Sequence, residues 1–85
     1  MTFRNQLLAI LDLNFQHASI FTLNEVYQVA EGMLSYHFPN NSTIDSSIRS
    51  NLQKLEETGY IYFVDEQGII IDRREGNGHY RLAWH

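Results

Sequence analysis

The chain has 85 residues, of which 44% are hydrophobic and 19% charged, with one proline and no cysteine. A chain of this length builds one hydrophobic core, so we expect a single domain over residues 1–85, and the lack of cysteine excludes disulfide bonds and thiolate zinc sites. The first apolar run, residues 7–11, is too short to span a bilayer and no secretory signal is recognisable, so we expect a soluble, cytoplasmic protein.

The first predicted element is an amphipathic helix over residues 2–15, because apolar residues recur there at helical spacing. They are Phe3, Leu7, Ile10, Leu11 and Phe15. Ile20 and Phe21 then form a short apolar bridge. Thr22, followed three residues later by Glu25, is a capping box and predicts the start of a second helix.

The second helix must end before Pro39, because the residue that precedes a proline disfavours the helical conformation. Gly32 lies inside it at a cost of about 1 kcal/mol relative to alanine, which the close approach of another helix would explain. Residues 38–43 are a turn by composition, and Ser42 or Thr43 can cap a third helix. The apolar face of that helix is Ile44, Ile48, Leu52 and Leu55, and Gly59 ends it.

After residue 60 the pattern changes to that of β-strands. Strands are predicted over residues 60–64 and 68–71 with a turn at 65–68, and a polar loop at 73–78 leads to a last strand, 79–84, that pairs with an earlier one. Three helices followed by a β-hairpin wing is the order of a winged helix-turn-helix domain, an α+β fold.

Several of these segments resemble one known family. They are residues 21–27 (FTLNEVY), 39–41 (PNN), 48–55 (IRSNLQKL), 59–61 (GYI) and 78–82 (GHYRL). Together they resemble the C-terminal winged-helix domain of Dam-replacing, DpnI-type restriction endonucleases over nearly the whole chain, most specifically over residues 38–60. The resemblance implies a module that binds DNA at an adenine-methylated site, while a separate nuclease domain cuts. We expect no nuclease domain within these residues, because no acid, acid-x-lysine arrangement is recognisable.

The outer face of the third helix is the predicted DNA-reading surface. With Ile48 and Leu52 toward the core, the helical period turns polar residues outward. Glutamine pairs with an adenine edge, and arginine pairs with a guanine edge or a phosphate. Hydroxyl groups bond to bases or to phosphate oxygens. The predicted contacts are Thr43, Ser46, Ser47, Arg49, Ser50, Gln53 and Lys54. The N-terminus of the third helix also suits a phosphate, although the charge of Asp45 opposes one. The alternative to a DNA-reading surface is that this outer face is only solvated.

The wing supplies the second set of predicted DNA contacts, namely Arg73, Arg74, Asn77 and His79. They would follow a backbone or enter a minor groove. The alternative is a solvated turn in which the arginines pair with Asp72 and Glu75. Arg81, between Tyr80 and Leu82 on a strand, should face solvent or a phosphate.

Catalytic and cofactor sites are not recognisable. The four histidines show no metal-ligand spacing, no serine is placed with a base as a nucleophile, and the glycines form no phosphate loop. We therefore expect no metal, no cofactor and no enzyme activity.

The sequence thus predicts a small protein that reads double-stranded DNA, as the recognition module of a restriction system or as a transcription regulator. Six basic residues should give weak DNA binding per copy, so we expect that the chain could act as a homodimer. A separate nuclease or regulatory protein is a further candidate partner. The net charge of −4 favours a rival, a winged-helix protein-protein interaction module without DNA binding. Acids beside the predicted DNA face support that rival, namely Glu56, Glu57, Asp65 and Glu66.

Overall fold

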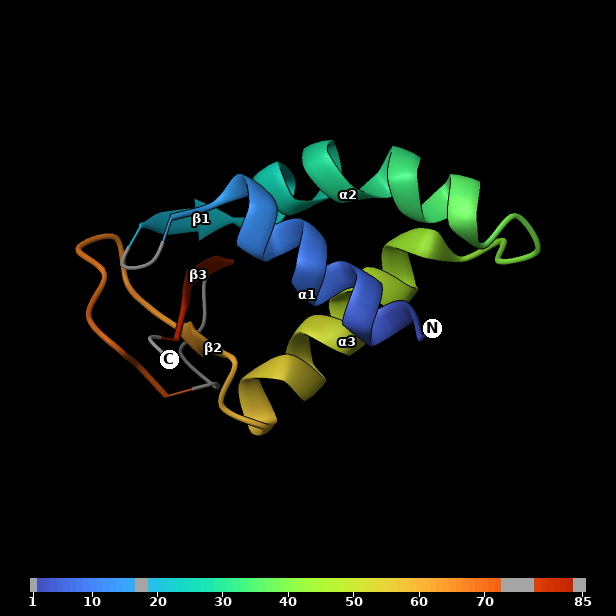
Figure 1. Ribbon diagram of the computed structural model, residues 1–85. Helices are drawn as coiled ribbons and strands as arrows, with labels where there is room; N and C mark the ends of the chain where they lie inside the picture. Colours follow the sequence, from blue (N-terminus) through green and yellow to red (C-terminus); the bar gives the residue numbers. More distant parts are fainter. Residues whose placement is uncertain (1, 17–18, 73–77, 84–85) are drawn as a thin grey trace.

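The computed structural model describes residues 2–16, 19–72 and 78–83. Three helices and a small antiparallel sheet make up this part of the chain (Figure 1). In chain order the elements are α1 (Phe3–Asn14), β1 (Ile20–Thr22), α2 (Leu23–His37), α3 (Ile44–Glu57), β2 (Ile61–Phe63) and β3 (His79–Leu82). The predicted α+β, winged helix-turn-helix architecture is confirmed.

Side chains cap the first two helices. Thr2 accepts a hydrogen bond from the backbone N–H of Asn5 at the start of α1. At the start of α2, the Glu25 N–H donates to the Thr22 hydroxyl at 3.2 Å, and the Glu25 carboxylate accepts from the Thr22 N–H at 3.0 Å. This reciprocal pair is the predicted capping box. Thr43 precedes α3 without a side-chain cap, so the expected hydroxyl cap of α3 is wrong.

Two glycines of the helical region differ from each other. Gly59 has φ +84° directly after the C-cap Thr58, which is the left-handed conformation expected where α3 ends. Gly32, inside α2, has open space around the position of a Cβ, with nothing within 4 Å. The prediction that another helix of the chain approaches Gly32 is therefore wrong for the part of the chain that the structure describes.

The sheet has the order β1-β3-β2, so β3 lies in the centre and pairs antiparallel with both neighbours. The expected apolar bridge at residues 20–21 is part of an edge strand, because β3 supplies it with a partner. The strand predicted over residues 68–71 is reduced to one bridge between Val64 and Ile70 on the outer side of β2. The side chain of Asp65 accepts from two backbone N–H groups there, which closes a tight turn instead of a longer hairpin.

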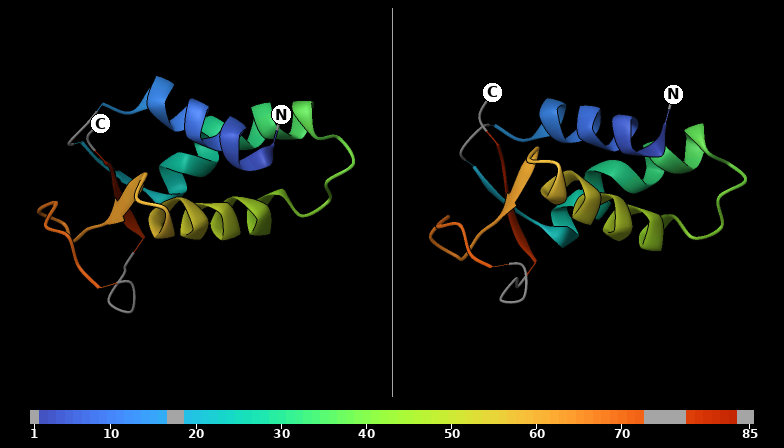
Figure 2. Two further views of the ribbon diagram at one scale, coloured as in Figure 1. Left: turned by 60° about the horizontal axis from the view of Figure 1, so that its bottom comes forward. Right: turned by 90° about the horizontal axis from the view of Figure 1, so that it is seen from below.

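The core lies between the three helices and one face of the sheet. Phe21 of β1 is fully buried, and its ring stacks on that of Phe15 at 4.4 Å and lies 5.8 Å from that of Tyr80. The sheet lies at one end of the molecule and the turn between α2 and α3 at the other (Figure 2). Helix α3 runs between these ends with one side toward the core, which leaves its other side at the surface.

Candidate nucleic-acid interface

The outer side of α3 carries the predicted polar row. Ile44, Ile48, Leu52 and Leu55 are buried, so the helical period turns Ser46, Ser50 and Gln53 to the opposite side, where all three are exposed. Arg49 and Lys54, also exposed, flank this row on its two sides. We call these five residues the α3 row. It presents small or amide side chains between two cations.

Arg49 acts electrostatically on a tyrosine of the sheet. Burial raises the pKa of the Tyr80 phenol in β3, the nearby Tyr27 raises it further, and the Arg49 guanidinium opposes that rise. The charge of Arg49 is therefore close enough to Tyr80 to act on it electrostatically.

Gln53 has an acidic neighbour one turn further along α3. Its amide nitrogen lies 3.5 Å from a carboxylate oxygen of Glu57, a long and exposed hydrogen bond. Such a contact exchanges easily with water or with another acceptor. Gln53 thus keeps its amide at the surface, with a negative charge beside it.

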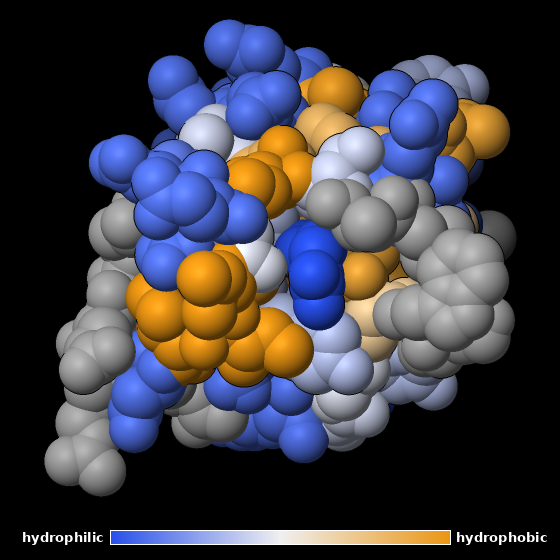
Figure 3. Space-filling view, turned by 90° about the vertical axis from the view of Figure 1, so that its left-hand side faces the viewer, coloured by the Kyte–Doolittle hydropathy of each residue, from blue (hydrophilic) through white to orange (hydrophobic). Residues whose placement is uncertain are grey.

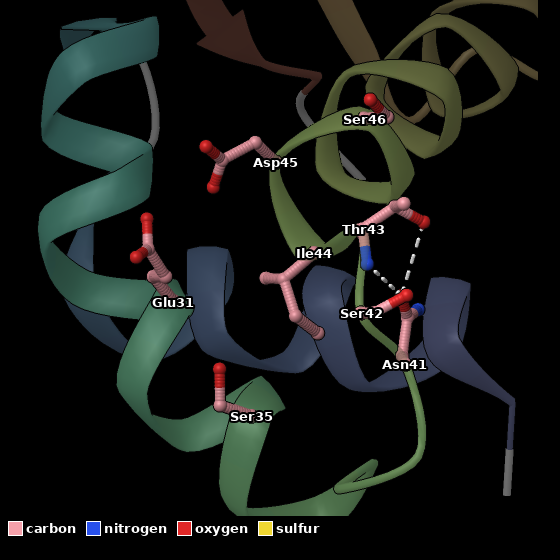
Figure 4. A pocket seen from close by; sticks show the side chains of 8 residues that line it. All are labelled: Glu31, Ser35, Asn41, Ser42, Thr43, Ile44, Asp45 and Ser46. Atoms are coloured by element: carbon pink, nitrogen blue, oxygen red, sulfur yellow. Dashed lines mark hydrogen bonds between the residues drawn. The ribbon is translucent and has the colours of Figure 1, made fainter.

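Asn41 fixes the turn before α3. Its side-chain oxygen accepts from the N–H of Thr43 at 2.8 Å and from the Thr43 hydroxyl at 3.2 Å (Figure 4). Its side-chain nitrogen donates to the Ser47 hydroxyl at 3.0 Å, and Asn51 donates to the Ser47 carbonyl at 2.8 Å. Ser47 is half-buried, and through these hydrogen bonds it stabilises the turn before α3. Asn41 belongs to the PNN turn noted in the sequence, and its hydrogen bonds fit the tendency of asparagine in a turn to bond to the backbone two residues on.

The N-terminus of α3 points into an open cavity beside α2. Thr43 and Ser46, two of the predicted DNA contacts, line it. Because no side chain caps the helix at Thr43, the positive end of the α3 dipole faces this cavity.

The wing is described only in part. Three of its predicted contacts, Arg73, Arg74 and Asn77, lie outside the described residues. His79 is half-buried in β3, opposite Thr22 of β1.

Arg81 lies on the outer face of the sheet. Its guanidinium carbon is 5.6 Å from the centre of the Tyr62 ring, a cation–π contact that holds the side chain over β2. Ile69 and Ile70 are 63% and 53% exposed at the outer edge of β2, and hydrophobic side chains are visible on this side of the molecule (Figure 3).

Among residues 2–16, 19–72 and 78–83, no three histidine, aspartate or glutamate side chains gather as metal ligands. No helix in the same ranges is long and apolar enough to cross a membrane.

Comparison with known proteins identifies the family. No curated protein and no solved structure is significantly similar to the chain. The model of the family described as Dam-replacing HTH domain matches residues 3–69, which include the three helices, β2 and the whole α3 row. The resemblance inferred from the sequence is thereby confirmed. The chain belongs to the Dam-replacing HTH domain family, whose helix-turn-helix is a DNA-binding module.

Proposed function

We propose that the domain reads duplex DNA by placing the α3 row in the major groove. The single observation that carries this proposal is the composition of that row: Ser46, Ser50 and Gln53 stand outward between the cations Arg49 and Lys54. The buried stripe on the opposite side of α3 holds the row in place. An α-helix with short side chains fits the width of the major groove and approaches the bases closely.

Each side chain of the row has a distinct chemical task in this proposal. Gln53 offers an amide that pairs with the N6 and N7 edge of adenine, and the serine hydroxyls bond to bases or phosphate oxygens. Arg49 and Lys54 neutralise phosphates on the two sides of the groove. The wing, with Arg73, Arg74, Asn77 and His79, adds contacts to the adjoining backbone or minor groove.

The biological setting we propose is a restriction-modification system. The family description, Dam-replacing, supports it. The domain would recognise the site, and a separate nuclease would be its partner. A preference for adenine-methylated over unmethylated duplexes distinguishes this setting from transcription regulation without a methylated target.

Fluorescence anisotropy with pooled duplexes, methylated and unmethylated, at roughly 50 and 200 mM salt tests the proposal. The variant Arg49→Ala with Gln53→Ala should lose at least about tenfold in affinity, since a good base contact and a phosphate contact are removed together. The matched control, Arg4→Ala with Gln28→Ala, removes the same groups from exposed positions on α1 and α2 and should change affinity little.

Two results would contradict the proposal. One is the lack of any binding by the wild-type domain at the lower salt concentration. The other is an equal loss of affinity in the α3 variant and in its control. Either result, together with a protein partner that binds the wild type and not the α3 variant, would establish an interaction module.

A further inference from the structure

Two carboxylates face each other beside the N-terminus of α3. Glu31 comes from α2 and Asp45 from the first turn of α3, and their side chains point toward one another across an open cavity of about 490 Å³ (Figure 4). The other lining residues are Ser35, Asn41, Ser42, Thr43, Ile44 and Ser46. All of these are uncharged, so the cavity is lined by two acids and no base.

The two carboxylates interact. Asp45 raises the pKa of Glu31 above its usual value, chiefly by charge repulsion and then by a hydrogen bond between the two side chains. None of the other ionisable groups on the three helices lines the cavity, and neither does Tyr80 of β3. These groups are Arg4 and Asp12 of α1, Glu25, Tyr27, Tyr36 and His37 of α2, and Arg49, Lys54, Glu56 and Glu57 of α3. The negative charge of the pair is therefore not neutralised within the cavity.

The pair lies where a DNA phosphate would otherwise be favoured. The uncapped start of α3 and the hydroxyls of Thr43 and Ser46 attract an anion. Two carboxylates in the same cavity repel one, because like charges a few ångströms apart repel each other even at a surface. Attraction and repulsion thus act on the same approaching group.

We propose that the Glu31–Asp45 pair weakens DNA binding at neutral pH by keeping phosphate away from the N-terminus of α3, and that loss of one of its charges strengthens binding. The inference rests on the proposed DNA-binding function. In this arrangement non-specific phosphate contact is reduced at the start of the helix. The bases beside the α3 row then account for a larger share of the affinity.

The test compares the affinities of wild type, Glu31→Gln and Asp12→Asn for one duplex, near neutral pH and near pH 5. Asp12→Asn is the control, since it removes the same charge from an exposed position on α1. Glu31→Gln should bind about two- to fivefold more tightly than the control near neutral pH. Wild type should gain more affinity on acidification than Glu31→Gln gains, because acid removes the charge of Glu31 in the wild type only. The histidines are the same in both proteins and contribute equally to the gain.

A second measurement does not depend on DNA. The folded state raises the pKa of Glu31, so it binds this proton more readily than the unfolded chain does. The contribution of Glu31 to stability is therefore present at low pH and lost as pH rises through the raised pKa. Urea unfolding should show that wild type loses stability relative to Glu31→Gln as pH rises from about 4 to 7.

The outcomes separate the two claims. Equal affinities of Glu31→Gln and Asp12→Asn, with wild type still binding DNA, would overturn the inference and leave the proposed function standing. No binding by any of the three proteins at either pH, with the expected difference in unfolding, would overturn the proposed function and leave the interacting carboxylates as a structural fact.

Discussion

Gly32 and Gly59 occupy opposite backbone environments, although both lie in the helical region. Gly32 is in the middle of α2 with open space around it, whereas Gly59 has φ +84° after α3. Alanine favours a helix interior over glycine but is strained at positive φ. The two positions should therefore respond to the same substitution in opposite directions.

Gly32→Ala should raise the free energy of unfolding by roughly 0.5–1 kcal/mol, and Gly59→Ala should lower it by about 1 kcal/mol or more. Urea denaturation followed by circular dichroism measures both, and each variant is the control for the other. A loss of stability in Gly32→Ala would contradict the open space around Gly32. A loss of DNA binding at unchanged stability would instead show that this side of α2 contacts the duplex.

The exposure of a side chain could be predicted from the sequence where it depends on the period of a single helix. Ser46, Ser50 and Gln53 are exposed as expected, because the buried stripe and the helical period decide which side faces solvent. The carboxylate pair could not be predicted, since it depends on how α2 and α3 cross. Whether the α3 row contacts DNA stays a prediction.

The turn between α2 and α3 decides how α3 is presented. The side chain of Asn41 makes three hydrogen bonds there, two to Thr43 and one to Ser47, whereas its neighbour Asn40 is exposed. The side chain of Asn41 thus fixes Thr43, the residue in front of α3, without capping the helix itself.

Asn41→Ala should lower the free energy of unfolding by about 1–2 kcal/mol, because it leaves a half-buried hydroxyl and a backbone N–H without a protein partner. DNA affinity should also fall, since the start of α3 would no longer be fixed. Thermal unfolding and anisotropy measure the two effects. Asn40→Ala, in the same turn, is the matched control, and an equal response of both variants would contradict this role of Asn41.

Among the elements, helices were predicted better than strands. The bounds of α1 and α2 follow from local signals, namely Thr2 and the Thr22–Glu25 capping box. The strand β1 was missed, and the strand predicted over residues 68–71 is reduced to one bridge, because the length of a strand depends on the segment that pairs with it. That partner, β3, lies far away in the sequence, so no local pattern reveals it.

At the scale of the whole molecule, the net charge of −4 limits how DNA can be bound. Favourable contact with phosphate must come from a local group of cations while the rest of the surface repels the duplex. Arg49 and Lys54 of the α3 row, with Arg73 and Arg74 of the wing, are the cations assigned to DNA in the proposed function.

Four phosphate contacts predict that the logarithm of the binding constant falls with the logarithm of salt concentration with a slope of about −4 per copy. Anisotropy titrations over a range of salt concentrations measure this slope. A dimer on two half-sites would double it. A slope near −2 would instead show that the wing arginines do not contact DNA, and Arg73→Ala with Arg74→Ala should then leave it unchanged.

The central position of β3 also affects the order in which the chain can fold. The strand at the middle of the sheet comes after every other described element in the chain, so β1 and β2 have no common partner until β3 has been synthesised. The helices depend on local contacts and can form early, whereas the sheet requires pairing across about sixty residues and should form late. Until β3 pairs with both neighbours, the side of Phe21 that Tyr80 covers stays open, and such transiently exposed apolar surface favours aggregation.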